Sequence, residues 1–409
     1  MRSIGQHRDE VAALVAPALR RAADDGAETH GTDDLATEAH AGAGYRVLAR
    51  SVAAPVPLPP FDNAQMDGFA VRAADAGRSV RVVDPVPAGV VPEPLDPGTA
   101  APIMTGARIP LGADAVFPVE ATDPGAFPAA LGLPTVTVPS DLAPGTFVRT
   151  TGSDLARGAE LAPAGSPVTP ALLGTLASAG VDEVLVVRPL RVLVVSTGSE
   201  LRGAGEATIG DANGIALRAA LAAVGAGSRT VRLPDDPNAL VAALDAAVGD
   251  WADLVLTTGG ISAGAYEVVR QALEPRGLRV TPVAMQPGGP QAVGTVTFAG
   301  RPLPVVSFPG NPVSALVSFE VFLRPVLAAA AGLPAERPTE VLPAAEGTTS
   351  PAAKHQVRRG RVEGGRVHFV GGASSHLLAH YAAATHLVHV PPGTSVVEPG
   401  DPLTVWSTR

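Results

Sequence analysis

The sequence predicts a multidomain α/β plus β protein, in which a central domain built on a parallel sheet is accompanied by two β-rich domains. Three observations support this prediction. Strand and helix patterns alternate regularly between residues 185 and 335. Short strands broken by proline and glycine fill residues 54–150 and return after residue 338. A chain of 409 residues is also too long to fold around one ordinary core.

The first half of the chain contains two predicted helices around a β-rich region. Residues 1–21 place charges within an apolar pattern, which indicates an amphipathic helix rather than a signal peptide. The runs VRVVDPV, PTVTVP and TFVRT within residues 54–150 indicate a small barrel or sandwich. The segment Ser166–Gly180 predicts a helix capped by Thr169, with Pro170 at its first position.

The central domain is predicted from strands that alternate with helices. Asp211 and Asp236 are the expected N-caps of two of the helices, and Pro237 follows at a first helical position. This spacing favours a parallel sheet, and ligands bind such sheets beyond the carboxyl ends of the strands. The predicted strands are Arg191–Ser196, Ser228–Leu233, Asp253–Thr258, Val280–Met285 and Pro304–Phe308.

The ends of these strands carry glycine, proline or short polar groups. After the last strand, Asn311 is an expected N-cap, Pro312 fits the first helical position, and Gly310 allows close backbone approach. Glycine-rich ends bring N–H groups near phosphates, and carboxylates at Glu200, Asp235 and Asp236 could hold Mg2+. The corner therefore predicts one wall of a phosphate site, although a simple β–α turn would explain it equally well by itself.

Composition excludes several classes of protein. A net charge of −9, with Lys354 as the only lysine, argues against a nucleic-acid surface. The absence of cysteine removes disulfides and thiolate metal sites, and neither GxGxxG nor the GxxxxGK[ST] loop occurs. We find no run of about 20 apolar residues that would span a membrane. These features together predict a cytoplasmic protein.

Five motifs resemble one family. DNAQMDGFAV (residues 62–71), MTGARIPLGADAVFPVE (residues 104–120), STGSEL, TTGGISAG and SFPGNPVSA occur in one order over nearly the whole chain. Together they resemble the MoeA family of molybdopterin molybdenumtransferases, which includes the E domain of gephyrin. The resemblance implies a MogA-like molybdopterin-binding α/β domain (residues 1–23 with 180–335), a helical linker domain (24–53 with 158–179), an inserted β-rich domain with the MDG motif (54–157) and a C-terminal β-barrel (336–409).

The resemblance also implies an activity and partners. Family members are homodimers whose active site lies between the α/β domain of one subunit and the MDG domain of the other. They receive adenylylated molybdopterin from a MogA-like enzyme and hydrolyse it in the presence of Mg2+ and molybdate. Molybdenum remains on the dithiolene sulfurs, and the finished cofactor passes to apo-molybdoenzymes. Neither nucleic acid nor a membrane is an expected partner.

The family's functional residues transfer to named positions of this sequence. The expected catalytic acids are Asp67, Asp154, Glu200 and Asp235, of which Asp67, Glu200 and Asp235 would bind the metal. From their surroundings alone, Asp67 could instead be a turn residue before Gly68, and Asp154 a helix cap or exposed turn. The expected binding residues are Thr105, Gly198, Asn213, Gly259, Gly260, Ser262, Glu267, Gln286, Pro309, Gly310, Asn311, Pro312 and Ser375.

The sequence departs from the family at two places. Family members commonly have KPGKP where this chain has QPGGP, so Gln286 and Gly289 replace two lysines, and Glu267 stands where aspartate is usual. We do not expect Lys354 to compensate, because it belongs to the C-terminal domain. A working transferase could obtain the missing positive charge from backbone N–H groups, from Arg72 or Arg358, or from the other subunit.

Two other functions stay open at this point. A degenerate relative could bind molybdopterin or its adenylate as a carrier or scaffold without inserting metal. A nucleotide-pyrophosphate hydrolase on the same core is the more remote alternative. We interpret the histidines of the C-terminal domain as structural.

Overall fold

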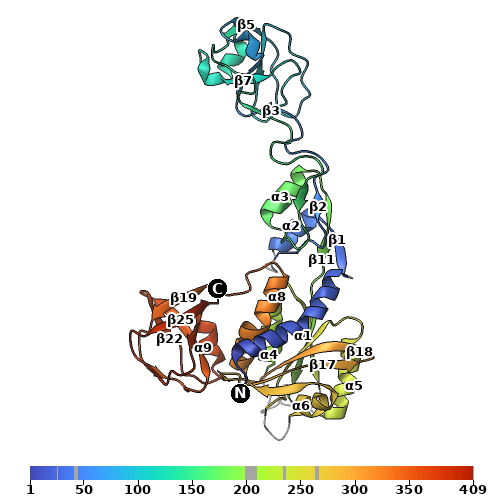
Figure 1. Ribbon diagram of the computed structural model, residues 1–409, viewed down its shortest axis with the longest axis vertical. Helices are drawn as coiled ribbons and strands as arrows, with labels where there is room; N and C mark the ends of the chain where they lie inside the picture. Colours follow the sequence, from blue (N-terminus) through green and yellow to red (C-terminus); the bar gives the residue numbers. More distant parts are fainter. Residues whose placement is uncertain (25, 41–44, 199–209, 234–235, 263–266, 409) are drawn as a thin grey trace. The chain divides into compact units, whose positions relative to one another are not determined.

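The computed structural model describes residues 1–24, 26–40, 45–198, 210–233, 236–262 and 267–408. These residues form two compact units (Figure 1). The large unit comprises Met1–Arg50, Ala164–Thr169 and Leu185–Arg409, and the small unit comprises Ser51–Pro163 and Pro170–Val184. The finer division into four domains stays a prediction.

A six-stranded mixed sheet is the centre of the large unit. Its order is β13 (Gly227–Leu233), β12 (Arg191–Thr197), β14 (Leu254–Thr258), β18 (Arg301–Phe308), β17 (Pro290–Phe298) and β15 (Arg279–Pro282). The strands from β13 to β18 are mutually parallel, as predicted. The three parallel strands β12, β14 and β18 therefore end at the same edge of the sheet.

One strand direction was predicted wrongly. The segment expected as a parallel strand over Val280–Met285 is β15, and it pairs antiparallel with β17. β17, which the sequence analysis missed, pairs antiparallel with β18. The two-residue connection explains this hairpin, because Ala299 and Gly300 both have positive φ, of 47° and 80°. The QPGGP segment therefore leads into β17 and does not end a parallel strand of this sheet.

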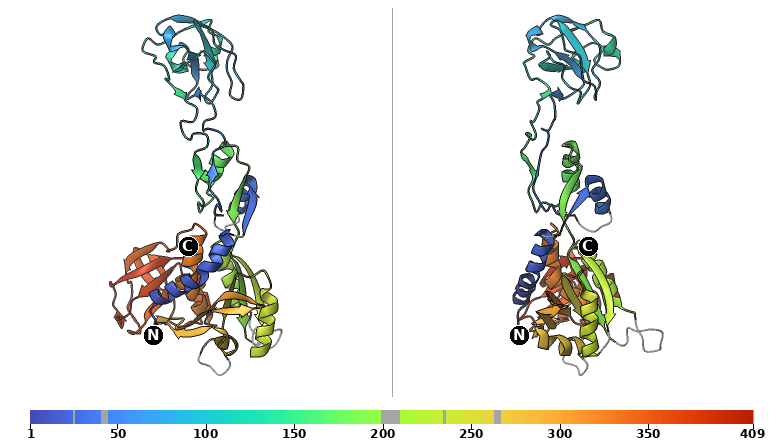
Figure 2. Two further views of the ribbon diagram at one scale, coloured as in Figure 1. Left: turned by 45° about the vertical axis from the view of Figure 1, so that its right-hand side comes forward. Right: turned by 90° about the vertical axis from the view of Figure 1, so that its right-hand side faces the viewer.

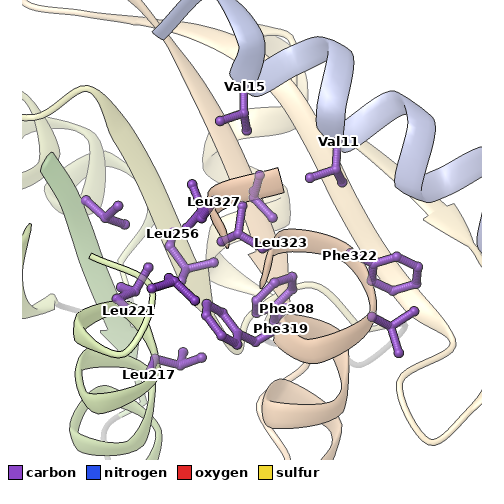
Figure 3. Close-up of a cluster of buried hydrophobic side chains, with 14 of the residues drawn as sticks. Val11, Val15, Leu217, Leu221, Leu256, Phe308, Phe319, Phe322, Leu323 and Leu327 are labelled. Carbon is purple, nitrogen blue, oxygen red and sulfur yellow. The ribbon is translucent and has the colours of Figure 1, made fainter. Parts of the chain in front are cut away.

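Helices cover both faces of this sheet. On one face, α1 (Ile4–Asp24), α4 (Ala212–Ala222), α7 (Pro312–Ser318) and α8 (Arg324–Ala330) share one core with Val192, Val194 and Leu256 of the sheet. Figure 3 shows Leu256 among the side chains of these helices. On the other face, α5 (Pro237–Val248) and α6 (Val268–Leu273) pack on alternate residues of the same strands, Leu193 and Val195 among them. This alternation is the period of two expected of a strand that is buried on both faces.

Two of the predicted helix caps are confirmed and one is wrong. Asp211 accepts a hydrogen bond from Gly214 N at 2.8 Å, and Asp236 accepts one from Ala239 N at 2.7 Å. Helix α3 begins at Pro170, as expected. Asn311 precedes Pro312 at the start of α7, but its side chain makes no capping hydrogen bond. The side chain of Asn311 is therefore not the cap that the sequence predicted.

The segment Pro312–Ala330 is long and apolar enough to cross a membrane by length and composition, contrary to our expectation that no run would be. It comprises α7, a π-helical turn (Phe319–Leu323) and α8. In its most apolar window, 72% is buried inside the protein. Its apolar side chains belong to the core in Figure 3, so core packing accounts for its composition.

The C-terminal strands lie beside the α/β sheet within the large unit (Figure 2). Their main sheet has the order β16, β21, β23, β25 and β19, with β22 beside β21. β16 comes from the α/β segment and pairs parallel with β21, so this sheet joins the two regions. The bounds are β16 (Met285–Gln286), β19 (Thr339–Pro343), β20 (Thr348–Thr349), β21 (His355–Glu363), β22 (Arg366–Phe369), α9 (Leu378–Ala383), β23 (His386–Val390), β24 (Val396–Val397) and β25 (Pro402–Ser407).

The small unit is β-rich, as predicted. Its main sheet has the order β7, β4, β6, β5 and β8 around a core that includes Phe69 and Phe117. The bounds are β2 (Val52–Ala53), β3 (Asn63–Ala64), β4 (Gly68–Val71), β5 (Ser79–Val82), β6 (Thr99–Ile103), β7 (Ala115–Pro118), β8 (Thr135–Thr137), β9 (Val148–Arg149), β10 (Glu160–Ala162) and α3 (Pro170–Ser178). In the large unit, β1 (Ala27–Gly31) precedes α2 (Thr32–His40), and β1 pairs with β11 (Glu183–Val187).

Candidate active site

A cavity of about 1180 Å³ lies at the carboxyl ends of the parallel strands of the large unit. Its walls include Thr197 and Gly198 at the end of β12, Thr258 to Ser262 at the end of β14, and Pro309 to Pro312 after β18. A cavity therefore lies at the edge of the sheet where the sequence analysis expected the site, whose function stays a prediction. The predicted binding residues that line the cavity are Gly198, Asn213, Gly259, Gly260, Ser262, Glu267, Gln286, Pro309, Gly310, Asn311, Pro312 and Ser375.

Two segments that follow neighbouring strands approach each other so closely that their backbones favour glycine. A Cβ atom on Gly310 would lie 3.2 Å from the Cα atom of Gly259, which itself has a φ of +89°. Gly260 has a φ of +68°, and a Cβ atom there would lie 2.9 Å from Val269 Cγ2. Backbone rather than side chains therefore forms this part of the wall, as suits contact with phosphate oxygens.

Asn213, on the first turn of α4, ties this wall together. Its Nδ2 donates to Thr258 Oγ1 at 2.8 Å and to the carbonyl oxygen of Gly310 at 2.7 Å. Nearby, Asp211 Oδ1 accepts from Ser196 Oγ at 3.0 Å as well as capping α4. Both Asn213 hydrogen bonds use the amide nitrogen, so the side chain fixes the corner after β18.

Another wall comes from the QPGGP segment and the strand that pairs with it. Gln286 lies opposite Gln356, and Gln356 Nε2 donates to Gln286 Oε1 at 2.8 Å. Lys354 immediately precedes this strand and lines the cavity. The expectation that Lys354 could not serve this site is therefore wrong, because the β16–β21 pairing brings the start of β21 to it.

A loop of the C-terminal region carries Ser374 and Ser375 into the cavity lining. Val313 N, in the first turn of α7, donates to the carbonyl oxygen of Ser375 at 3.3 Å. Two consecutive arginines of β21 hold the start of the loop: Arg358 Nη2 donates to Gly371 O at 3.0 Å, and Arg359 Nη2 donates to Gly372 O. The position of Ser375 therefore depends on contacts from both α7 and β21.

In the small unit, the structure brings Asp67 and Thr105 together. Asp67 Oδ1 accepts hydrogen bonds from Thr105 Oγ1 at 2.7 Å and from Thr105 N at 2.6 Å. The hydroxyl bond, followed by the amide bond, lowers the pKa of Asp67. Gly68 has a structural role of its own, because a Cβ atom there would lie 2.1 Å from the carbonyl oxygen of Phe117. Asp67 is thus held ionised and exposed at the start of β4.

The remaining predicted acids do not complete a metal site in the part of the chain that the structure describes. Asp154 is exposed in a turn of the small unit, and its backbone N–H donates to Leu58 O at 2.9 Å. Glu200 and Asp235 lie outside the described residues. Among the described residues, no group of three or more His, Asp or Glu side chains could hold a metal ion. The carboxylate of Asp211, which lines the cavity, is already used in capping α4.

Sequence reasoning missed several residues of the cavity. Lys354 had a visible signal, as the only lysine of the chain, whereas Gly288 and Ser374 had none beyond their predicted neighbours. Asp211 was predicted only as a helix cap, and the structure adds its contact with Ser196.

Comparisons with known proteins agree with this architecture. Residues 3–180 match the family described as MoeA N-terminal region (domain I and II), and residues 193–329 match the family described as Probable molybdopterin binding domain. The chain belongs to the MoeA family. The predicted MoeA-like multidomain fold and the family assignment are thereby confirmed.

Individual relatives extend over most of the chain. Molybdopterin molybdenumtransferase 2 of Mycobacterium tuberculosis is 43% identical over 383 residues, covering 88% of this chain and 92% of that protein. The molybdopterin molybdenumtransferase of Synechococcus elongatus is 34% identical, with coverage of 89% and 92%. A crystal structure of the MoeA protein of Pyrococcus horikoshii matches with a TM-score of 0.75 and 26% identity, covering 97% of this chain and 98% of that one.

Proposed function

We propose that this MoeA-family chain is a molybdopterin molybdenumtransferase. In the proposed reaction, adenylylated molybdopterin is hydrolysed with Mg2+, AMP is released, and molybdate supplies the molybdenum that the dithiolene retains. The observation that supports this function best is the cavity at the carboxyl ends of β12, β14 and β18. It is large enough for a nucleotide-sized ligand, and glycine backbone forms much of its wall.

The residues of the chain would bind and orient the phosphoanhydride. The N–H of Gly259 donates to Phe308 O at 3.0 Å, so the backbone that follows Gly259 would approach the phosphate oxygens, and no side chain intervenes at Gly260. Ser262 and Ser375 line the same cavity, and serine hydroxyl groups can donate hydrogen bonds to a ligand. Ser374 also lines it, but its hydroxyl group is hydrogen-bonded to His376 Nδ1 at 2.7 Å. Asn213 keeps the Gly310 corner in place while the ligand binds.

We propose Mg2+ binding only from the ligands that the sequence predicts. Glu200, Asp235 and Asp67 would hold it, and the ion would neutralise charge on the phosphoanhydride. The described residues do not assemble such a site, so we derive no step through the metal. In Asp67, the hydrogen bonds from Thr105 maintain the ionised carboxylate that a metal or a water molecule would require.

The partners and compartment are further parts of the proposal. We propose a cytoplasmic homodimer whose site combines the cavity of one subunit with the Asp67 region of the other. A MogA-like enzyme would supply the adenylate, and apo-molybdoenzymes would accept the cofactor. Analytical ultracentrifugation at micromolar concentration tests the dimer, and a monomeric mass would argue against a composite site.

The experiment that tests the function measures AMP release from adenylylated molybdopterin, with and without Mg2+ and molybdate. We expect release that depends on molybdate in the wild type and is lost in Asp67→Ala. Asp96→Ala, which removes another exposed aspartate of the small unit, is the matched control. Tight binding without AMP release would instead support a protein that carries the adenylate without inserting metal. The replacement of the family's two lysines by Gln286 and Gly289 favours this alternative.

A further inference from the structure

We infer that Lys354 is the cation that holds the oxyanion of the ligand in this cavity. The inference rests on the proposed function, which gives the cavity an anionic ligand. Among the described residues that line the cavity, Lys354 is the only basic one, and it is the only lysine in the sequence. An anion site that lacks lysines at Gln286 and Gly289 needs its positive charge from another residue.

The backbone around Lys354 is fixed next to the QPGGP segment. Lys354 N donates to Pro351 O at 2.9 Å, and the following residue, His355, donates from its N–H to Ala284 O at 2.9 Å. The parallel register then places Met285 opposite His355. Both Lys354 and Gln286 line the cavity, so one wall holds a basic residue beside a residue with a neutral amide.

Gln286 cannot supply the charge, but its orientation suits a supporting donor. Its Oε1 accepts from Gln356 Nε2, which leaves the amide nitrogen to donate. Lys354 itself makes no ion pair with a carboxylate anywhere in residues that the structure describes, so its charge is not neutralised within them. A flexible stem with three ammonium donors suits phosphate or molybdate oxygens.

Other positive groups near this wall are used elsewhere or are neutral. Arg358, one of the residues expected to compensate, donates to Thr348 Oγ1 at 2.9 Å and to Gly371 O, and its guanidinium lies over the Phe369 ring. Burial lowers the pKa of His355, and it lowers the pKa of its partner His389 to about 3, so both imidazoles are neutral near pH 7.

The test combines loss of the charge with its return from a second position. Lys354→Ala removes the ammonium, Lys354→Arg keeps a positive charge, and the double variant Lys354→Ala with Gly289→Lys restores a lysine at the same wall. Gly289 can accept a side chain because its φ is not positive and a Cβ atom would lie 3.4 Å from Met285 O. Arg361→Ala, an exposed arginine of the same strand, is the control.

Calorimetry measures the binding of adenylylated molybdopterin to each variant. AMP release is measured at increasing molybdate concentration, and the melting temperature of each variant reports its stability. For Lys354→Ala we expect the affinity for the oxyanion that it holds to fall roughly tenfold to a hundredfold, given the usual strength of a charge-assisted hydrogen bond. Weaker adenylate binding would identify a ligand phosphate, and a higher half-saturating molybdate concentration would identify molybdate. We expect Lys354→Arg and the double variant to recover most of the loss.

The outcomes separate this inference from the proposed function. The inference would be overturned, while the function stands, if Lys354→Ala matched the wild type in adenylate binding and in the molybdate dependence of AMP release. A wild type that binds the adenylate through Lys354 but releases no AMP would overturn the function while the inference stands. Recovery by Gly289→Lys shows that charge at the cavity, and not the fold around residue 354, is what the alanine variant lost.

Discussion

Asn213 Nδ2 lies 2.7 Å from the carbonyl oxygen of Gly310, so a side chain of α4 holds the corner that follows β18. The same nitrogen also donates to Thr258 Oγ1 at the end of β14. Two strand ends whose backbones nearly touch are thereby connected through one amide. We interpret Asn213 as a positioning residue that keeps the wall of the cavity in shape.

Asn213→Ala removes both hydrogen bonds. We expect a loss of about 1–3 kcal/mol in the free energy of unfolding, because the buried hydroxyl of Thr258 and the carbonyl oxygen of Gly310 both lose their donor. We also expect adenylylated molybdopterin to bind at least several-fold more weakly. Asn238→Ala is the matched control, since Asn238 holds the same second position in α5 but is exposed. Equal effects of the two variants on ligand binding would contradict the positioning role.

Gly260→Ala tests the need for a bare backbone after β14. We expect the free energy of unfolding to fall by about 2–4 kcal/mol, because Gly260 has a positive φ and a Cβ atom there would contact Val269 closely. Gly300→Ala is the control, because Gly300 has a φ of +80° and no atom within 4 Å of its Cβ position. Chemical denaturation of both variants separates the strain of φ from the contact, and an identical loss in both would mean that the contact with Val269 is unimportant.

Thr105→Val should raise the pKa of Asp67, because the hydroxyl hydrogen bond is the largest cause of its depression. A depressed carboxyl pKa stabilises the folded protein above the unfolded pKa, near pH 4, and this contribution is lost as the pH falls through the folded value. The variant should therefore lose less stability than the wild type between about pH 5 and pH 2. NMR titration of the Asp67 carboxyl carbon measures the shift directly.

A second pair in the small unit provides an internal control for that titration. Asp62 accepts from Thr151 N and Thr151 Oγ1, both at 2.7 Å, and these bonds lower its pKa in the same way. We expect Thr105→Val to leave the titration of Asp62 unchanged, and Thr151→Val to leave that of Asp67 unchanged. A shift of both carboxyls in either variant would indicate a general change of the unit.

Arg358→Met should disturb the loop that carries Ser375. The substitution leaves Thr348 Oγ1 and Gly371 O without their charged donor, which should cost about 2–3 kcal/mol of stability. If the loop positions the ligand, the KM for the adenylate should also rise while kcat changes less. Arg366→Met, an exposed arginine on β22, is the control. A change in stability with an unchanged KM would assign Arg358 a structural role alone.

Local signals in the sequence were sufficient to predict much of the fold and the position of the site. Apolar runs and caps such as Asp211 and Asp236 locate the strands and helices, because these depend on neighbouring residues. Gly259 and Gly310 marked the strand ends that form the cavity. Once these strands are parallel, their carboxyl ends lie at one edge, so the site follows from topology.

Features that depend on long-range pairing could not be predicted in this way. The direction of Val280–Met285 is set by its pairing with β17, and an apolar run carries no mark of direction. The place of Lys354 depends on a two-residue strand, β16, that pairs with a strand far along the chain. Lys354 immediately precedes β21, and this end of the strand extends to the cavity. Glu200 and Asp235 stay predictions because they lie outside the described residues.

The most direct test of the central claim is the ratio of molybdenum delivered to AMP released. Wild-type protein is incubated with adenylylated molybdopterin, Mg2+ and molybdate, then with an excess of an apo-molybdoenzyme, and both AMP and the reconstituted enzyme are counted. We predict one molybdenum delivered for each AMP released. AMP release without any reconstituted enzyme would contradict the transferase and indicate a nucleotide-pyrophosphate hydrolase.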